Sequence, residues 1–200
     1  MNENLMEEAE LFERFYYELF LHIIRDYKNR TGEELKMYKE YEPEYLRKFY
    51  CNHMDNQDFF DQITNITSNL ILIQALSNAN HRTAFIFIRI YLKKHGIYIR
   101  TYEEEKEKYD AFYDISKPII DKDINRLQFF NDKYLDVHHT MAIKTHFNSL
   151  KKLFESVVEL PQSGMVTLES LHSFIASLNQ SGSSPSENQL GSSGVILNIQ

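Results

Sequence analysis

Apolar side chains recur at every third or fourth position along most of this 200-residue chain, and this period constrains the fold more than any other feature. Such spacing places the side chains on one face of an α-helix, which must then be buried against a neighbour. The first thirty residues show the pattern most clearly, at positions 12, 15, 16, 19, 20, 23, 24 and 27. Gly32 follows and predicts the end of that helix.

The same period predicts a largely helical chain. A loop and then a short helix are expected between Glu33 and Tyr50. A second strong helix begins near Asn56 or Asp58, and a third runs from Asn80 to His95 and ends at Gly96. The alternating segment at 97–100 predicts one short strand. Helices are then expected near 102–116, 119–134 and 139–159. We therefore predict an all-α helical bundle with at most a short β element.

Composition changes after Leu160, where PQSG breaks the helical period. Residues 166–178 are expected to form only one or two amphipathic turns. The stretch NQSGSSPSENQLGSSG is rich in serine and cannot bury enough apolar surface to fold alone. Residues 179–200 are therefore predicted to be a flexible tail.

Charge and composition exclude several classes of partner. The net charge is −7, which disfavours binding to nucleic acid or to anionic membranes. The acidic start, MNENLMEEAE, does not resemble a signal peptide, and no apolar run approaches the ~20 residues that span a bilayer. The single cysteine, Cys51, excludes an intramolecular disulfide. We expect a cytoplasmic protein that binds neither nucleic acid nor membrane.

An amide-rich loop, SNANHR, lies between the second and third predicted helices. The first N–H groups of a helix have no intrahelical partner and carry partial positive charge. Asn80 adds an amide donor, Arg82 adds a planar guanidinium suited to phosphate oxygens, and Ala79 lets the backbone approach closely. The loop therefore predicts a phosphate-binding site made of Asn78, Ala79, Asn80, His81 and Arg82.

A purely structural role for this loop is the alternative interpretation. In it, Asn78 caps the following helix, and Asn80 and Arg82 are solvated residues of the first turn. The helix then contributes to the core and binds no anion.

Residues 74–85, QALSNANHRTAF, resemble the signature loop of the Fic/Doc (Fido) family. The closest pattern is that of the Doc (death-on-curing) branch, H-x-F-x-D-x-N-K-R-T-A-L. The segment RIYLKKHGIYI resembles the end of the next helix and the short strand that follow this loop in the family. The resemblance covers about residues 56–100 and extends more loosely from the first helix to about residue 135. It therefore implies a Fic/Doc-like helical core over residues 1–135 and a C-terminal helical extension over 136–178.

The resemblance implies a helical fold whose loop holds the phosphates of a nucleotide. In the family, a histidine acts as general base, an acid holds magnesium, and an Asn and an Arg bind phosphate. Fic members transfer AMP to proteins, whereas the Doc toxin transfers a phosphate. Asn80 and Arg82 match the phosphate-binding pair, Leu76 replaces a buried Phe, and His81 replaces the usual Lys or Gly.

Two departures from the family pattern fall on the chemistry. Gln74 stands at the histidine position, and its neutral amide cannot accept a hydroxyl proton as an imidazole does. Asn78 stands at the position of the metal-binding acid, where its carbonyl is a weak ligand for a hard cation. No catalytic residue is therefore assigned with certainty, and His81 is only a weak candidate for the missing base.

Two functional hypotheses follow from this pattern. The first is a Fic/Doc-like protein with impaired catalysis that binds a nucleotide, another phosphate ligand, or a protein partner. The alternative is an active transferase of AMP or phosphate from a nucleotide to a protein hydroxyl, using an unconventional base. ATP or another nucleotide with magnesium is the implied cofactor, and a protein target or an antitoxin-like partner is the implied macromolecule.

The remaining histidines give a weaker signal. His138, His139 and His146 lie near Asp136, which resembles a metal-binding cluster. However, His139 and His146 are two helical turns apart, about 10 Å along the axis, and cannot share one ion. We expect solvated or core-edge histidines there and no metal site.

Overall fold

The computed structural model describes residues 3–55, 58–122, 137–161 and 168–180. Within these ranges the chain forms seven helices and one two-stranded sheet. The helices are α1 (Glu3–Thr31), α2 (Pro43–Asn52), α3 (Phe59–Leu72), α4 (Asn80–Lys93), α5 (Lys106–Lys122), α6 (Val137–Val157) and α7 (Leu171–Gln180). The strands are β1 (Tyr98–Ile99) and β2 (Val158–Glu159). The predicted all-α class with a short β element is confirmed.

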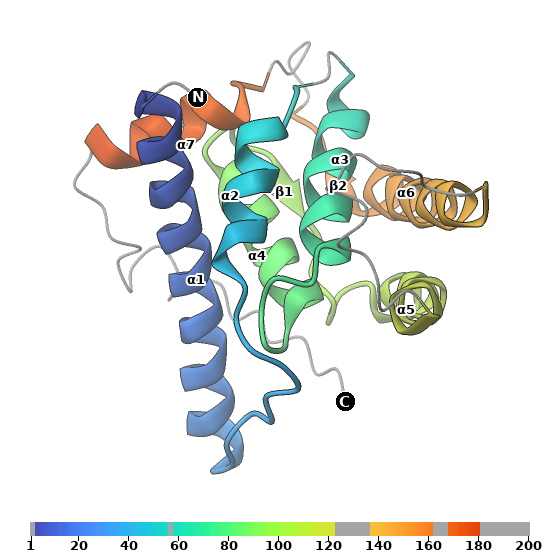
Figure 1. Ribbon diagram of the computed structural model, residues 1–200. Helices are drawn as coiled ribbons and strands as arrows, with labels where there is room; N and C mark the ends of the chain where they lie inside the picture. Colours follow the sequence, from blue (N-terminus) through green and yellow to red (C-terminus); the bar gives the residue numbers. More distant parts are fainter. Residues whose placement is uncertain (1–2, 56–57, 123–136, 162–167, 181–200) are drawn as a thin grey trace.

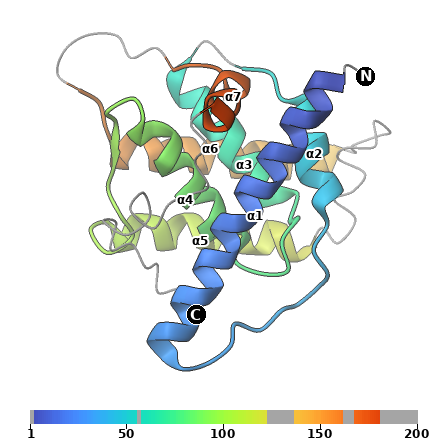
Figure 2. The same ribbon diagram turned by 90° about the vertical axis from the view of Figure 1, so that its left-hand side faces the viewer.

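Helix α4 lies in the middle of the bundle (Figure 1). It packs against α1 on one side and α3 on another, and it leads into β1. Helices α5 and α6 run alongside one another, away from α1, and α6 also packs on α3. In the turned view α1 crosses in front of α4, with α5 and α6 behind (Figure 2). The start of α4 is thus surrounded by several helices that are far apart in the sequence.

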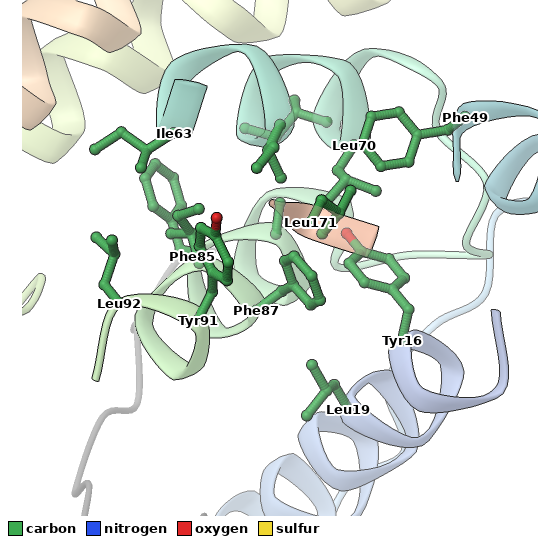
Figure 3. Packing of buried hydrophobic residues seen from close by; sticks show 14 of the residues in the cluster. Tyr16, Leu19, Phe49, Ile63, Leu70, Phe85, Phe87, Tyr91, Leu92 and Leu171 are labelled. Atoms are coloured by element: carbon green, nitrogen blue, oxygen red, sulfur yellow. The ribbon is translucent and has the colours of Figure 1, made fainter. Parts of the chain in front are cut away.

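One continuous apolar core joins all seven helices. Figure 3 shows Tyr16 of α1, Phe87 of α4 and Leu171 of α7 facing the same interior space, and the rings of Tyr16 and Phe87 lie 5.8 Å apart. Leu171, Phe174 and Ile175 of α7 are fully or almost fully buried. The described part of 136–178, predicted as an extension, therefore packs into the same core as residues 3–122.

The first and third predicted helices are confirmed as α1 and α4. Gly32 and Gly96 follow these helices with φ of 74° and 70°, the left-handed conformation that glycine adopts without strain. The apolar positions of α4 that the period predicts are buried, among them Phe85, Phe87 and Ile88. Periodicity and a glycine stop signal therefore located both helices.

The predicted break between 116 and 119 is wrong. Helix α5 runs without interruption to Lys122, with Pro118 inside it. A proline removes one helical hydrogen bond, but Pro118 lies on the exposed side of α5, where water can satisfy the carbonyl that loses its partner. Most of the helix expected at 119–134, and the tail from residue 181, fall outside the described residues.

Two short elements differ from expectation near the C-terminus. The predicted strand at 97–100 is β1, and its antiparallel partner is β2, directly after α6, with Tyr98 opposite Glu159. No local pattern predicts that partner, because residues 158 and 159 continue the helical period. Helix α7 has 10 residues, more than the one or two turns predicted. In the described part of the chain, no helix is long and apolar enough to cross a membrane.

The central position of α4 generates a stability prediction. Ile88 is 0% exposed, so Ile88→Asp places an unpaired carboxylate among apolar side chains. We expect a loss of about 4 kcal/mol or more in the free energy of unfolding, measured by urea denaturation. Ile115→Asp is the matched control, because Ile115 is 39% exposed. A cooperatively folded Ile88→Asp protein with the stability of the control would show that this face of α4 is not core.

Candidate anion-binding site at the start of helix α4

Two residues in the left-handed conformation bracket the loop between α3 and α4. Gln74 has a φ of 48° and Ala79 a φ of 55°, and they are the only non-glycine residues with positive φ in the described part of the chain. This conformation costs a non-glycine residue roughly 1–2 kcal/mol. Surrounding contacts must therefore hold the loop in this shape.

Asn80 supplies the contacts that hold the loop from within. Its Oδ1 accepts a hydrogen bond from the N–H of Leu76 at 3.0 Å, and its Nδ2 donates to the carbonyl of Leu76 at 3.0 Å. Nδ2 also contacts Gln74 Oε1 at 3.4 Å. Asn80 is 7% exposed, so the alternative interpretation of a solvated side chain is wrong. Its amide braces the turn from which α4 starts.

The connection between α1 and α2 holds the loop from outside. The N–H of Tyr38 donates to the carbonyl of Ser77 at 3.0 Å, and the N–H of Glu42 donates to that of Ala75 at 2.9 Å. Asn78 Nδ2 donates to the carbonyl of Lys36 at 2.7 Å. Residues 36–42 thus lie along the loop, an arrangement that local sequence patterns do not reveal.

Helix α4 begins without a side-chain cap. Its N-cap residue is Ala79, and no side chain accepts a hydrogen bond from the first turn. Asn78, the cap in the alternative interpretation, instead accepts from the N–H of Ala79 outside the helix, so that interpretation is wrong. By contrast, Asp58 caps α3 through the N–H of Asp61. The first turn of α4 also carries no acidic residue, and its positive end therefore stays uncompensated within the described residues.

Arg82 occupies the third position of this first turn and is only partly exposed. Burial lowers the pKa of its guanidinium, and smaller electrostatic effects on this pKa come from Tyr113, Arg30 and Asp26. Among the described residues Arg82 forms no hydrogen bond or ion pair. A desolvated arginine thus adds positive charge to the uncapped end of α4.

Gln74 is turned toward its own loop. Nε2 donates to the carbonyl of Ile71 at 2.6 Å, while Oε1 faces Asn80. Both polar ends of this side chain therefore stabilise the turn. The position that matches the family's histidine holds a neutral structural amide.

The magnesium site implied by the family does not fit the residues present. Asn78 Oδ1 already accepts from Ala79, and its Nδ2 donates to Lys36. Among the described residues, no group of three His, Cys, Asp or Glu side chains is arranged to hold a metal ion. The backbone of α6 is described from Val137 onward, but the side chains of His138 and His139, and all of Asp136, lie outside the described structure.

His81 points into the bundle. Its Nε2 lies 2.7 Å from Ser116 Oγ of α5, and its ring lies 5.3 Å from that of Tyr113. Ser116 Oγ also lies 2.9 Å from Nε2 of His146 on α6. His146 is 0% exposed. The expectation of a solvated or core-edge position is wrong for His146, which is buried against two hydroxyl groups.

Sequence reasoning missed the serines that hold these histidines. Ser116 follows Tyr109, Phe112 and Tyr113 at helical spacing on the buried face of α5, and Ser68 lies on the buried face of α3. A polar residue at a position that the period assigns to the core was the signal available, since buried polar groups almost always have partners.

A protein-family model described as "Family of unknown function (DUF8172)" matches residues 1–115. The chain belongs to this family. The part of the chain that matches the DUF8172 model runs from α1 into α5 and includes the whole loop and α4, but it ends one residue before Ser116. Neither the curated proteins nor the solved structures contain a match to the chain.

Because Ala79 is left-handed, a glycine at this position is predicted to raise the free energy of unfolding. Ala79→Gly removes the steric cost of that conformation at the expense of some chain entropy, and should stabilise the protein by about 0.5–1 kcal/mol. Ala84→Gly, in the regular part of the same helix, should destabilise it by about 1 kcal/mol or more. Urea denaturation measures both. Destabilisation by both variants to a similar extent would contradict the left-handed turn.

Proposed function

We propose that the loop and first turn of α4 bind a phosphate group, that of a nucleotide such as ATP or AMP in the first instance, and that catalysis is impaired. The observation that carries this proposal is the start of α4, which no described side chain caps, beside Arg82, which is partly buried and has no hydrogen bond or ion pair within the described residues. A phosphate would accept hydrogen bonds from the first-turn N–H groups and from the guanidinium at the same time.

The rigidity of the loop supports this proposal. Asn80 and the segment 36–42 fix the backbone before any ligand arrives. A site that is already ordered loses little conformational freedom on binding. Asn80 contributes here by holding the loop, not by donating to the ligand, which refines the role that the Fic/Doc resemblance implies.

Impaired catalysis rests on Gln74 and Asn78. General-base catalysis contributes typically ~10²–10⁴-fold to a rate, and a glutamine amide cannot replace it. Among the described residues, His81 directs Nε2 to Ser116, so this nitrogen is occupied in the interior. The proposed Fic/Doc-like scaffold therefore keeps phosphate recognition without an evident base.

A protein partner is a second candidate, favoured by two exposed side chains next to the loop. Met37 is 45% and Tyr38 71% exposed, and the backbone of Tyr38 is bonded to Ser77. Exposed methionine and aromatic side chains are typical of the centres of protein interfaces. A protein target or an antitoxin-like partner would contact these residues and the phosphate site together.

If the phosphate site is at the start of α4, removing Arg82 should lower the affinity for ATP and removing Arg89 should not. Arg82→Ala should weaken ATP binding by about tenfold or more, because a charge-assisted hydrogen bond contributes ~1.5–3 kcal/mol. Arg89→Ala is the matched control: burial also lowers the pKa of Arg89, but this residue lies two turns further along the helix. Calorimetric titration compares the two. Equal ATP affinities of both variants and the wild type would remove Arg82 from the site.

The alternative of an active transferase is tested by restoring the two family residues. Gln74→His with Asn78→Asp should together produce self-modification with labelled ATP and magnesium, while the wild type and both single variants stay inactive. Because Asn78→Asp loses the donor to Lys36, thermal unfolding of each variant is measured first. Transfer by the wild type that is lost in His81→Ala would instead establish the active transferase.

A further inference from the structure

Among the described residues, two tyrosine hydroxyls are buried without a hydrogen-bond partner, that of Tyr16 on α1 and that of Tyr113 on α5. Tyr16 is 1% exposed and Tyr113 is 3% exposed. A buried phenol usually bonds to an acceptor, because an unbonded hydroxyl that has lost its water is costly. The surroundings of the two hydroxyls differ, and only those of Tyr113 point to a ligand.

Tyr16 has apolar aromatic neighbours. Its ring lies 5.8 Å from those of Phe12 and Phe87, and burial raises the pKa of its phenol well above the usual value, with no charged group contributing. Nothing in these surroundings would attract an anion. Tyr16 therefore serves as the reference for a buried hydroxyl that is only part of the core.

Tyr113 lies against the first turn of α4. Its ring is 5.3 Å from that of His81 and 6.3 Å from that of Phe85, one turn further along. Arg82 follows His81 in the sequence, and its charge acts on the pKa of Tyr113 against the dominant effect of burial, which raises that pKa well above the usual value. Tyr113 in turn has the largest electrostatic effect on the pKa of Arg82. The phenol of α5 and the guanidinium of α4 are thus close neighbours.

Arg82 and Tyr113 have the same unmet requirement, a hydrogen-bond acceptor. Within the described part of the chain, Arg82 forms no hydrogen bond or ion pair and the Tyr113 hydroxyl has no partner, so the two are not bonded to each other either. A guanidinium offers donors only, and a phenol offers one donor. A phosphate group has several acceptor oxygens and can accept from both at once.

The acidic side chains that act on this pair already have partners. Asp26 affects the pKa of Arg82, but its carboxylate lies 3.0 Å from Arg30. Asp110 affects the pKa of Tyr113, but its carboxylate contacts Lys106 and accepts from Tyr102 at 2.9 Å. No carboxylate among the described residues therefore occupies the place of the anion.

We propose that Tyr113 is a second ligand-binding side chain of the anion site, whose hydroxyl donates a hydrogen bond to the phosphate group that Arg82 and the first turn of α4 also contact. The inference rests on the proposed function for the position of the site, and it adds α5 as a wall of that site. Arg82 is partly exposed, so its side chain can move to admit an anion that reaches the buried phenol. Because burial raises the pKa of Tyr113, the phenol keeps its proton and remains a donor at neutral pH.

The test is the isosteric variant Tyr113→Phe, which keeps the ring and removes only the donor. We expect its affinity for AMP and for inorganic phosphate, measured by calorimetric titration, to fall about tenfold or more. Tyr16→Phe is the matched control, because it removes an equally buried, unbonded hydroxyl, and it should bind both ligands as the wild type does. Neither variant loses a hydrogen bond within the described residues, so urea denaturation should find both at least as stable as the wild type.

The outcomes separate this inference from the proposed function. If Arg82→Ala weakens AMP binding but Tyr113→Phe binds AMP and phosphate like the wild type, the inference is overturned and the proposed function stands. If inorganic phosphate binds in a Tyr113-dependent manner but AMP does not bind, the inference stands and the nucleotide proposal is contradicted. Absence of binding by both ligands contradicts both. An equal loss of affinity in Tyr16→Phe, or a loss of stability in Tyr113→Phe alone, would show a structural role for the hydroxyl and overturn the inference.

Discussion

The pair of hydrogen bonds between the Asn80 amide and the backbone of Leu76 is the contact on which the candidate site depends. It closes a turn that places two non-glycine residues, Gln74 and Ala79, in the left-handed conformation. Once Asn80 is used in this way, neither it nor Asn78 caps α4. Within the described residues no side chain caps the first-turn N–H groups, and Arg82 is the charged side chain of that turn.

The rest of the bundle fixes this turn in space. Helix α4 is buried along Phe85, Phe87 and Ile88, and this packing fixes the position of its first turn. The α1–α2 connection is bonded to Ser77 and Ala75. His81 is tied to α5, and through His146 to α6 and α3. Interactions from distant parts of the sequence therefore converge on one helix terminus, as is common where a rigid scaffold presents a binding loop.

The sequence was sufficient for those features that depend on local patterns. The period of apolar residues located α1, α3 and α4, and the loop followed from its amide-rich composition. It was not sufficient where distant contacts decide. Asparagine commonly caps helices, but the side chain of Asn78 is hydrogen-bonded to the backbone of Lys36 and Ala79 instead. Proline commonly interrupts a helix, but Pro118 lies on the exposed face of α5 and the helix continues past it. The partners of His81 and His146 depend on how α5 and α6 pack, which no local spacing reveals.

The start of α4 is proposed to recognise a phosphate group. Calorimetric titration of the wild-type protein with AMP and with adenosine tests this most directly, because the two ligands differ only in that group. We expect AMP to bind and adenosine to bind at least tenfold more weakly, with inorganic phosphate competing against AMP. Equal affinity for AMP and adenosine, or no binding of AMP and ATP at all, would contradict the claim.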